Sequence, residues 1–144
     1  LWPVLDGKAE EVNDAVFAEI TFHAAAEPVR SVRTRRWRYI RRYDPRLRPV
    51  GTNADVSPSK ELLVAAGWSE ERYSAEELYD CTIDPQQRAN RAGDPACVEA
   101  LHQMRGRLDE WMRATDDPLT GGVSALPQDD RLLDPDDFIL RVGG

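Results

Sequence analysis

The chain has 144 residues and a formal net charge of −7, with 41% hydrophobic and 31% charged residues. These values are ordinary for a single soluble globular domain, and no apolar run approaches the length that would cross a bilayer. Cys81, Cys97 and two isolated histidines lack paired ligand spacing, which favours neither a zinc site nor a disulfide scaffold.

The charge is unevenly distributed along the chain. Residues 30–48 contain nine arginines and a single acid, Asp44, so the remainder is strongly acidic. A basic island in an acidic chain predicts a local anionic partner rather than general polyanion binding. Because the sequence does not start with methionine and begins within an apolar segment, we expect it to be a fragment of a longer protein.

The first half of the chain predicts strands. Residues 1–14 are expected to be a connector, and residues 15–22 form a mostly apolar strand. Runs 29–34 and 37–43 predict a hairpin. Alternation in the second run separates two sets of side chains: Trp37, Tyr39 and Tyr43 on one face, and Arg38, Ile40 and Arg42 on the other.

A loop separates this hairpin from the next predicted strand. Residues 44–59, rich in proline, are expected to be irregular. Ser59 is predicted to cap a short helix over residues 60–66 that ends at Gly67. Residues 77–81 then predict a short strand.

The clearest element is a helix over residues 95–114. Asp94 suits the N-cap and Pro95 the first helical position. An apolar stripe recurs at spacings of 4, 3, 4 and 3 through Cys97, Leu101, Met104, Leu108 and Trp111. A helix with one apolar stripe lies on a sheet, so the predicted fold class is α+β: a small antiparallel sheet of about four strands with one long C-terminal helix on one face.

Three phrases resemble the C-terminal part of sulfatases, in the same order. EELYDCTIDPQQRANRAGDP (76–95) resembles that family's "ELYDL..DP.E..NL..DP", although Gln87 replaces the usual Glu and Arg91 the usual Leu. VRSVRTRRWRYI (29–40) resembles its "RAVRT.RYKYI" hairpin, and residues 101–119 resemble its last helix. Together with His23, Glu27 and Arg30, these phrases are most similar to the heparan N-sulfatase (sulfamidase)-like sulfatases.

The resemblance implies a division of the chain. Residues 1–14 would connect to a missing N-terminal catalytic domain, residues 15–117 would form the sulfatase C-terminal subdomain, and residues 118–144 an acidic tail that wraps the surface or is partly disordered. The implied partners are the catalytic domain of the same protein and, for the whole enzyme, a sulfated small molecule or glycan. A membrane partner is not expected, and nucleic acid is disfavoured.

The family's chemistry implies groups that this sequence does not contain. Sulfatases use formylglycine made from Cys or Ser in C/S-x-P-S-R, together with calcium held by carboxylates. Neither the residues after Cys81 nor those after Ser57 match that pattern, and no Asp-rich cluster precedes them. We therefore expect no catalytic residue, metal ligand or cofactor in this chain; calcium and formylglycine are implied for the catalytic domain.

The candidate substrate-binding residues are His23, Glu27 and Arg30. They fall on a strand-to-hairpin loop, where function tends to concentrate, and the resemblance implies that this loop borders the substrate pocket. The alternative is structural: His23 hydrogen-bonds locally and Arg30 pairs with Glu27. For residues 77–94 we predict a structural connector whose Asp and Asn side chains bind backbone N–H groups.

The arginine-rich hairpin has three interpretations. It is a solvated sheet face that also docks on the catalytic domain, or a surface that binds a sulfated, acidic glycan through paired hydrogen bonds. The third is nucleic-acid binding, with the hairpin aromatics as stacking platforms; the acidity of the whole chain argues against it. The alternative to a sulfatase subdomain is thus a stand-alone anion- or nucleic-acid-binding α+β module.

Overall fold

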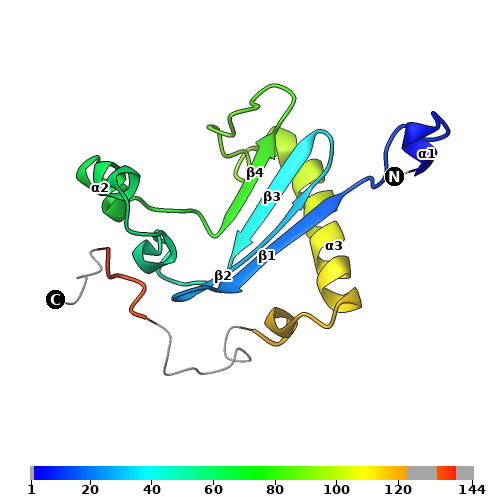
Figure 1. Ribbon diagram of the computed structural model, residues 1–144. Helices are drawn as coiled ribbons and strands as arrows, with labels where there is room; N and C mark the ends of the chain where they lie inside the picture. The colour runs from blue at the N-terminus through cyan, green and yellow to red at the C-terminus, as the bar shows by residue number, and fades with distance from the viewer. Residues whose placement is uncertain (1, 123–132, 139–144) are drawn as a thin grey trace.

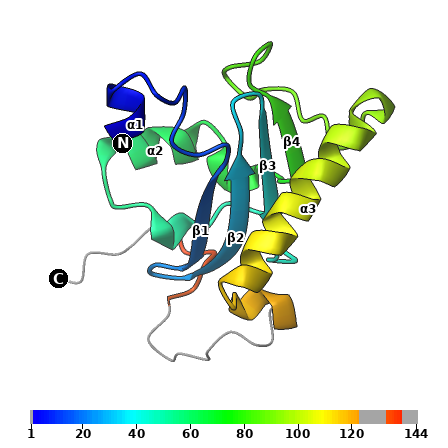
Figure 2. The same cartoon turned by 90° about the vertical axis from the view of Figure 1, so that its right-hand side faces the viewer.

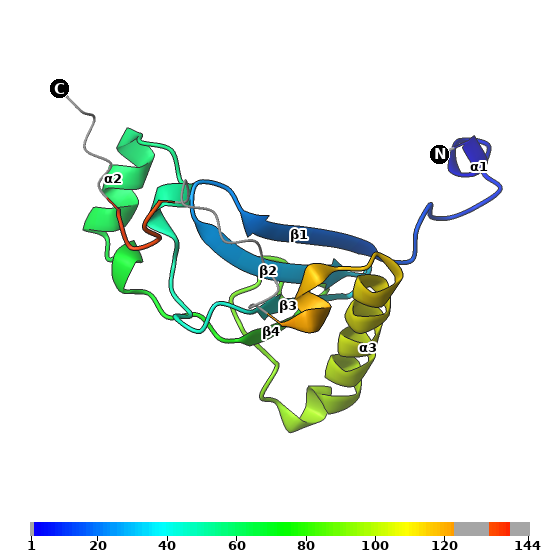
Figure 3. The ribbon, with the colours of Figure 1, turned by 90° about the horizontal axis from the view of Figure 1, so that it is seen from below.

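A four-stranded antiparallel sheet forms the centre of the molecule (Figure 1). The computed structural model describes residues 2–122 and 133–138. The strands are adjacent in chain order: β1 (Val16–Phe22), β2 (Ala26–Arg33), β3 (Trp37–Arg42) and β4 (Glu76–Asp80). One long helix, α3 (Val98–Ala114), crosses one face, in front of the strands in Figure 2 and below them in Figure 3. The predicted α+β class is therefore confirmed.

Helix α3 packs on the sheet through a stripe close to the predicted one. Asp94 caps a 3₁₀ turn at Pro95–Cys97 by accepting from the Ala96 N–H, and α3 follows directly. Its buried residues are Leu101, Met104, Leu108 and Met112. Trp111, predicted to end the stripe, is only half-buried because Met112 continues the helical spacing from Leu108. The Trp111 ring instead stacks on Phe17, with ring centroids 5.1 Å apart.

The sheet face under α3 is built from two different rows of side chains. The register aligns one apolar row across all four strands: Phe17, Val32, Tyr39 and Leu78. A second row on the same face, displaced by two residues along each strand, is ionic: Glu19, Arg30, Arg41 and Glu76. The core therefore gives way to a charged layer towards one end of the sheet.

Helix α3 supplies counter-charges to that ionic row. The Arg41 Nη1 lies 2.6 Å from Oδ1 of Asp109, and Arg105 pairs with Glu76. The Tyr39 hydroxyl donates to Glu76, and burial together with that carboxylate raises the pKa of Tyr39 to about 12. These contacts fix the position of α3 along the sheet as well as against it.

The loop between β3 and β4 contains the predicted short helix. It forms α2 (Pro58–Ala65), and Gly67 follows it with φ of 95°, a left-handed conformation that suits glycine. The predicted cap was wrong: Ser57, not Ser59, accepts from the Lys60 N–H, because the helix begins at Pro58. Helix α1 (Trp2–Leu5) buries no residue and lies away from the sheet, so the N-terminal segment adds little to the core (Figures 1 and 3). Within the described residues, no helix has the length and apolarity needed to span a membrane.

The connector after β4 is held by side chains, as predicted. Asn90 Oδ1 accepts from the backbone N–H groups of Leu78 and Ala92 at 3.0 and 2.9 Å, and its Nδ2 donates to the Glu76 carbonyl. Asp84 accepts from the Ala89 N–H at 2.8 Å. Asn90 thereby bonds backbone groups along the outer edge of β4, which would otherwise be an unpaired strand edge.

The described part of the predicted tail makes several ordered contacts. Asp117 caps a 3₁₀ turn at Pro118–Gly121, and Leu119, 3% exposed, belongs to the core cluster. Further on, the Leu133 N–H donates to the Ala24 carbonyl, and the Gly51 N–H to the Pro135 carbonyl. Residues 123–132 and 139–144 of the predicted tail lie outside the described residues.

Leu108→Ala should lower the free energy of unfolding by about 2–5 kcal/mol, because Leu108 is fully buried in the core between α3 and the sheet. Chemical denaturation of the 144-residue chain measures this loss. Leu62→Ala is the control: that side chain is 72% exposed, so the change should stay within about 0.5 kcal/mol. Equal effects at the two positions would contradict the packing of α3.

Candidate functional site

The three predicted site residues lie on or near the turn between β1 and β2, but in different environments. His23 is exposed on the turn, and its imidazole makes no hydrogen bond to a described residue. Glu27, near the start of β2, is half-buried, whereas Arg30 is only 1% exposed. The fold therefore places His23 and Glu27 near the surface and Arg30 in the interior.

Asn53, from the 3₁₀ helix Gly51–Asn53, holds the turn in place. Its Oδ1 accepts from the backbone N–H groups of Ala24 and Ala25 at 2.9 and 2.8 Å. Its Nδ2 donates to the Ala25 carbonyl and, at 2.9 Å, to Oε2 of Glu27. A single side chain far away in sequence thus fixes both the backbone of the turn and one candidate side chain.

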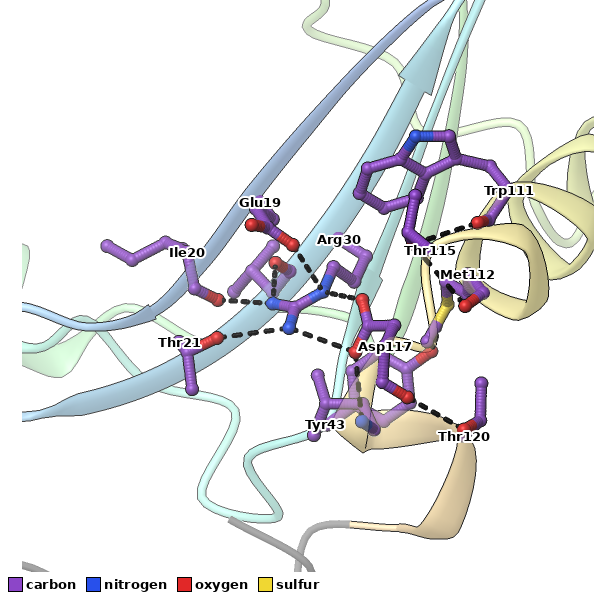
Figure 4. Close-up of polar contacts among 12 residues, drawn as sticks. Glu19, Ile20, Thr21, Arg30, Tyr43, Trp111, Met112, Thr115, Asp117 and Thr120 are labelled. Carbon is purple, nitrogen blue, oxygen red and sulfur yellow. Dashed lines mark hydrogen bonds and ion pairs between the residues drawn. The ribbon is translucent and has the colours of Figure 1, made fainter. Parts of the chain in front are cut away.

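Arg30 is saturated by hydrogen bonds within the chain (Figure 4). Its Nε and Nη2 donate to the two carboxylate oxygens of Asp117, at 2.5 and 3.1 Å. Its Nη1 donates to the carbonyls of Ile20 and Val29, at 2.7 and 3.0 Å, and Nη2 also donates to the Thr21 hydroxyl at 3.0 Å. A guanidinium has five N–H donors. All five have acceptors here, so direct contact with a substrate anion would require breaking one of these bonds.

The predicted alternative pairing of Arg30 with Glu27 is not observed. Residues three positions apart in a strand point to opposite faces, and Arg30 faces α3 while Glu27 bonds to Asn53. A second carboxylate, Glu19, lies 3.6 Å from the Arg30 Nε in the same row. Arg30 therefore joins β1, β2 and the end of α3.

Asp117 is kept ionised by its surroundings. Burial opposes its charged form, but the hydrogen bonds from Arg30 and from the Leu119 N–H outweigh this effect and lower the pKa of Asp117 below its ordinary value. The site thus contains a buried, fully hydrogen-bonded ion pair between segments 87 residues apart.

The site depends on two residues that sequence reasoning did not select, Asn53 and Asp117. The Asp117-Pro118 pair is a recognisable cap signal, which could have identified Asp117 as a helix cap, although not as the partner of Arg30. For Asn53 no local signal exists, since all of its acceptors and donors lie in the β1–β2 region.

Most arginines of the basic island have polar partners in the chain. Besides Arg30, these pairs are Arg36–Asp80, Arg38–Gln87, Arg41–Asp109, Arg42–Glu77 and Arg46–Asp44. Among the described residues, Arg33, Arg35 and Arg48 have no such partner: Arg33 and Arg35 lie at the turn between β2 and β3, and Arg48 lies in the loop after β3. This pattern favours the interpretation of a solvated sheet face over a continuous polyanion-binding surface.

The residues of this chain do not fit the cofactors implied by the resemblance. The sequence contains no C/S-x-P-S-R segment that could yield formylglycine. Within residues 2–122 and 133–138, no group of three or more His, Cys, Asp or Glu side chains is arranged to hold a metal ion.

Comparison with known proteins identifies the family. The chain is 32% identical to an ulvan-active sulfatase of Formosa agariphila over 109 residues, which cover 67% of this chain and 18% of that protein. It is 30% identical over 133 residues to the N-sulphoglucosamine sulphohydrolase of Homo sapiens, covering 82% of this chain and 26% of that enzyme. The chain belongs to the sulfatase family. A second ulvan-active sulfatase of Formosa agariphila is 28% identical over 130 residues, 26% of its length, so this sulfatase chain spans about a fifth to a quarter of its relatives.

Solved structures agree with this assignment. A protein from Bacteroides thetaiotaomicron assigned as a sulfatase superposes with a TM-score of 0.58 at 25% identity, covering 84% of this chain and 21% of that one. A 2-O GAG sulfatase superposes with a TM-score of 0.57 at 24% identity, again over 84% of this chain and 21% of that one, and shows the same fold. No family model matches the chain.

Asp117→Asn should lower the free energy of unfolding by about 3–5 kcal/mol near neutral pH, because it leaves the Arg30 guanidinium buried without its counter-charge. The pKa of Asp117 is lower in the folded chain than its ordinary value. Its stabilisation is therefore complete above the unfolded-state pKa of about 3.9 and is lost as the pH falls through the folded-state value. Urea unfolding of both proteins should show a constant difference at neutral pH that shrinks below about pH 4.

Asp14→Asn is the matched control for this experiment. Asp14 pairs with Arg107 at 2.7 Å, but its side chain is 70% exposed. Exposed ion pairs contribute little to stability, so this variant should lose much less than Asp117→Asn. Similar losses in the two variants, or a difference for Asp117→Asn that does not depend on pH, would contradict the importance of the buried pair.

Proposed function

We propose that this chain is the C-terminal subdomain of a longer sulfatase, a hydrolase of sulfuric esters or sulfamates, and that it is not catalytic alone. The observation that carries the proposal is the coverage: sulfatases match 67–87% of this chain but only 18–26% of their own length. Residues 15–117 would form the subdomain, preceded by a connector over residues 1–14. The principal partner would be the catalytic domain of the same protein, which would supply formylglycine and calcium.

The β1–β2 turn would contribute to the rim of the substrate pocket. Three observations support this role. The turn is exposed at His23, and Asn53 holds its backbone by hydrogen bonds. Arg30 also donates hydrogen bonds to Ile20 and Thr21, at the end of β1 just before the turn. Such preorganisation reduces the entropy lost on binding. His23, whose imidazole has no hydrogen-bond partner among residues 2–122 and 133–138, would donate a hydrogen bond to an anionic substrate. Glu27 would orient the rim, and Arg30 would act in substrate binding by positioning this turn.

The substrate of the whole enzyme would be a sulfated small molecule or glycan. A sulfate ester carries a permanent negative charge, which a hydrogen-bond donor at a partly desolvated rim can hold more strongly than bulk water does. Two relatives are named ulvan-active sulfatases and the human relative is named N-sulphoglucosamine sulphohydrolase. The sulfated amino sugar in the last name supports this substrate class.

The 144-residue chain should not hydrolyse an aryl sulfate such as 4-nitrophenyl sulfate, whereas the longer protein that contains it should. The expected difference follows from the residues themselves, since sulfate transfer needs an activated nucleophile and this chain has no formylglycine segment. Turnover by the purified chain above the level of a mock purification would overturn the non-catalytic role.

His23→Ala in the longer protein should lower kcat/KM by about tenfold to a hundredfold, the loss expected for one hydrogen bond to a charged group. His102→Ala is the matched control, because His102 is the chain's other histidine and lies exposed on α3. Neither variant should change the stability of the 144-residue chain appreciably. Full activity of His23→Ala, or equal losses in both variants, would exclude His23 from the rim.

A further inference from the structure

The β1–β2 turn has little local chemistry to fix its conformation. Its three residues, 23–25, are His-Ala-Ala, without the Gly, Asn or Asp that usually fixes a short hairpin loop. The pairing of β1 with β2 also changes register between Ile20 and Phe22, just before the turn. Within the turn, a backbone hydrogen bond of 3.2 Å joins the His23 N–H to the Ala25 carbonyl. The position of the turn therefore depends on contacts from other parts of the chain.

Distant segments bond every backbone polar group of Ala24 and Ala25. Asn53 Oδ1 accepts from both N–H groups, and Asn53 Nδ2 donates to the Ala25 carbonyl. The remaining group, the Ala24 carbonyl, accepts from the Leu133 N–H at 2.8 Å. Ala25 is 0% exposed, and a buried backbone group without a partner is costly. These bonds therefore couple the turn to two segments that lie far away in the sequence.

The segment 133–138 is itself anchored on the 3₁₀ helix that carries Asn53. The Gly51 N–H donates to the Pro135 carbonyl at 3.1 Å. A Cβ atom placed on Gly51 would lie 2.6 Å from Cγ of Phe138 and 2.9 Å from its Cα, so only glycine allows this close approach. The segment is therefore fixed at one end, while its other end bonds the turn.

Hydrogen bonds hold Ala24 from both sides. Its N–H donates to Asn53 and its carbonyl accepts from Leu133. Hydrogen bonds weaken steeply when their distance or angle changes, so a shift of the turn would weaken both contacts together. Because His23 directly precedes Ala24, its backbone follows the orientation of this residue.

We propose that the segment 133–138 is a positioning element: together with Asn53 it determines where the β1–β2 turn, and with it His23, lies. The Leu133 N–H acts directly on the turn, and the packing of Phe138 on the 3₁₀ helix keeps that donor in place. The effect on substrate binding rests on the proposed function of His23 at the rim, whereas the contact with the turn rests on the geometry alone.

Hydrogen exchange of the 144-residue chain tests the contact with the turn. Leu133→Pro removes the N–H that bonds the Ala24 carbonyl, and the Ala24 and Ala25 amides should then exchange at least about tenfold faster, because the turn opens more often. Leu133→Ala is the matched control, since it keeps the backbone N–H and changes only a side chain that is 46% exposed. It should leave both rates unchanged. Unchanged rates in Leu133→Pro, or equal acceleration in the two variants, would overturn the proposal.

Phe138→Ala is the second variant, because proline also restricts the residue before it. This change removes the ring packed on Gly51 and leaves the Leu133 N–H in the chain. The Ala24 and Ala25 amides should again exchange faster, by about threefold or more, because the donor is no longer held in place. Full protection of both amides in Phe138→Ala would overturn the role of the anchored segment.

Kinetics of the longer protein test the positioning of His23. Leu133→Pro should lower kcat/KM by about threefold to tenfold, a smaller loss than removal of the imidazole itself, and Leu133→Ala should match the unaltered protein. In a His23→Ala background, Leu133→Pro should cause no further loss, because no imidazole is left to position. Additive losses would show that the segment acts only on stability and would overturn the positioning role. Full activity of His23→Ala would instead reject the proposed rim, and hydrogen exchange would then decide the contact with the turn by itself.

Discussion

The buried ion pair between Arg30 and Asp117 is the contact on which the arrangement of the sheet and the C-terminal segment depends. It joins the middle of β2 to the residue that ends the α3 region, and through the Ile20 and Thr21 bonds it also includes β1. A buried pair is costly to desolvate and is tolerated only when its remaining hydrogen-bonding groups are satisfied. Arg30 meets that condition through its five donors, and Asp117 through its bond from the Leu119 N–H. Removing either partner would therefore leave a charge in the interior without compensation.

The two rows of the sheet face play different physical parts. The apolar row gives α3 a surface to bury, but apolar contacts are non-directional and would tolerate small shifts of the helix. The ionic row is directional: Arg41 reaches Asp109 and Glu76 reaches Arg105, and a shift of one residue in α3 would break both contacts. Apolar burial thus supplies most of the stability, while the polar contacts select one register for the helix.

One end of the molecule brings together the β1–β2 turn, the 3₁₀ helix Gly51–Asn53 and residues 133–138. Asn53 fixes the β1–β2 turn, and Gly51, two residues before it, admits the Phe138 ring. Residues 133–138 contact the turn through Leu133, and Phe138 also borders a hollow beside α2. The segments that meet there are far apart in sequence, as Figure 1 shows for the β1–β2 turn, α2 and the last described segment. The β1–β2 turn and the α2 side of the molecule therefore share supports in residues 51–53 and 133–138.

The sequence by itself determined the elements and their class. Strand alternation, the Asp94-Pro95 cap and the stripe through Leu101, Met104 and Leu108 are local patterns, and the fold confirms them. The sequence also indicated the sulfatase family, because three segments that resemble sulfatase motifs occur in the family's order. Only the tertiary structure decided the partners of the polar side chains: Asp117 rather than Glu27 for Arg30, and Asn53 for the turn. The physical reason is that backbone periodicity depends on near neighbours, whereas ion pairs and side-chain hydrogen bonds depend on which distant segments the packed core brings within about 3 Å.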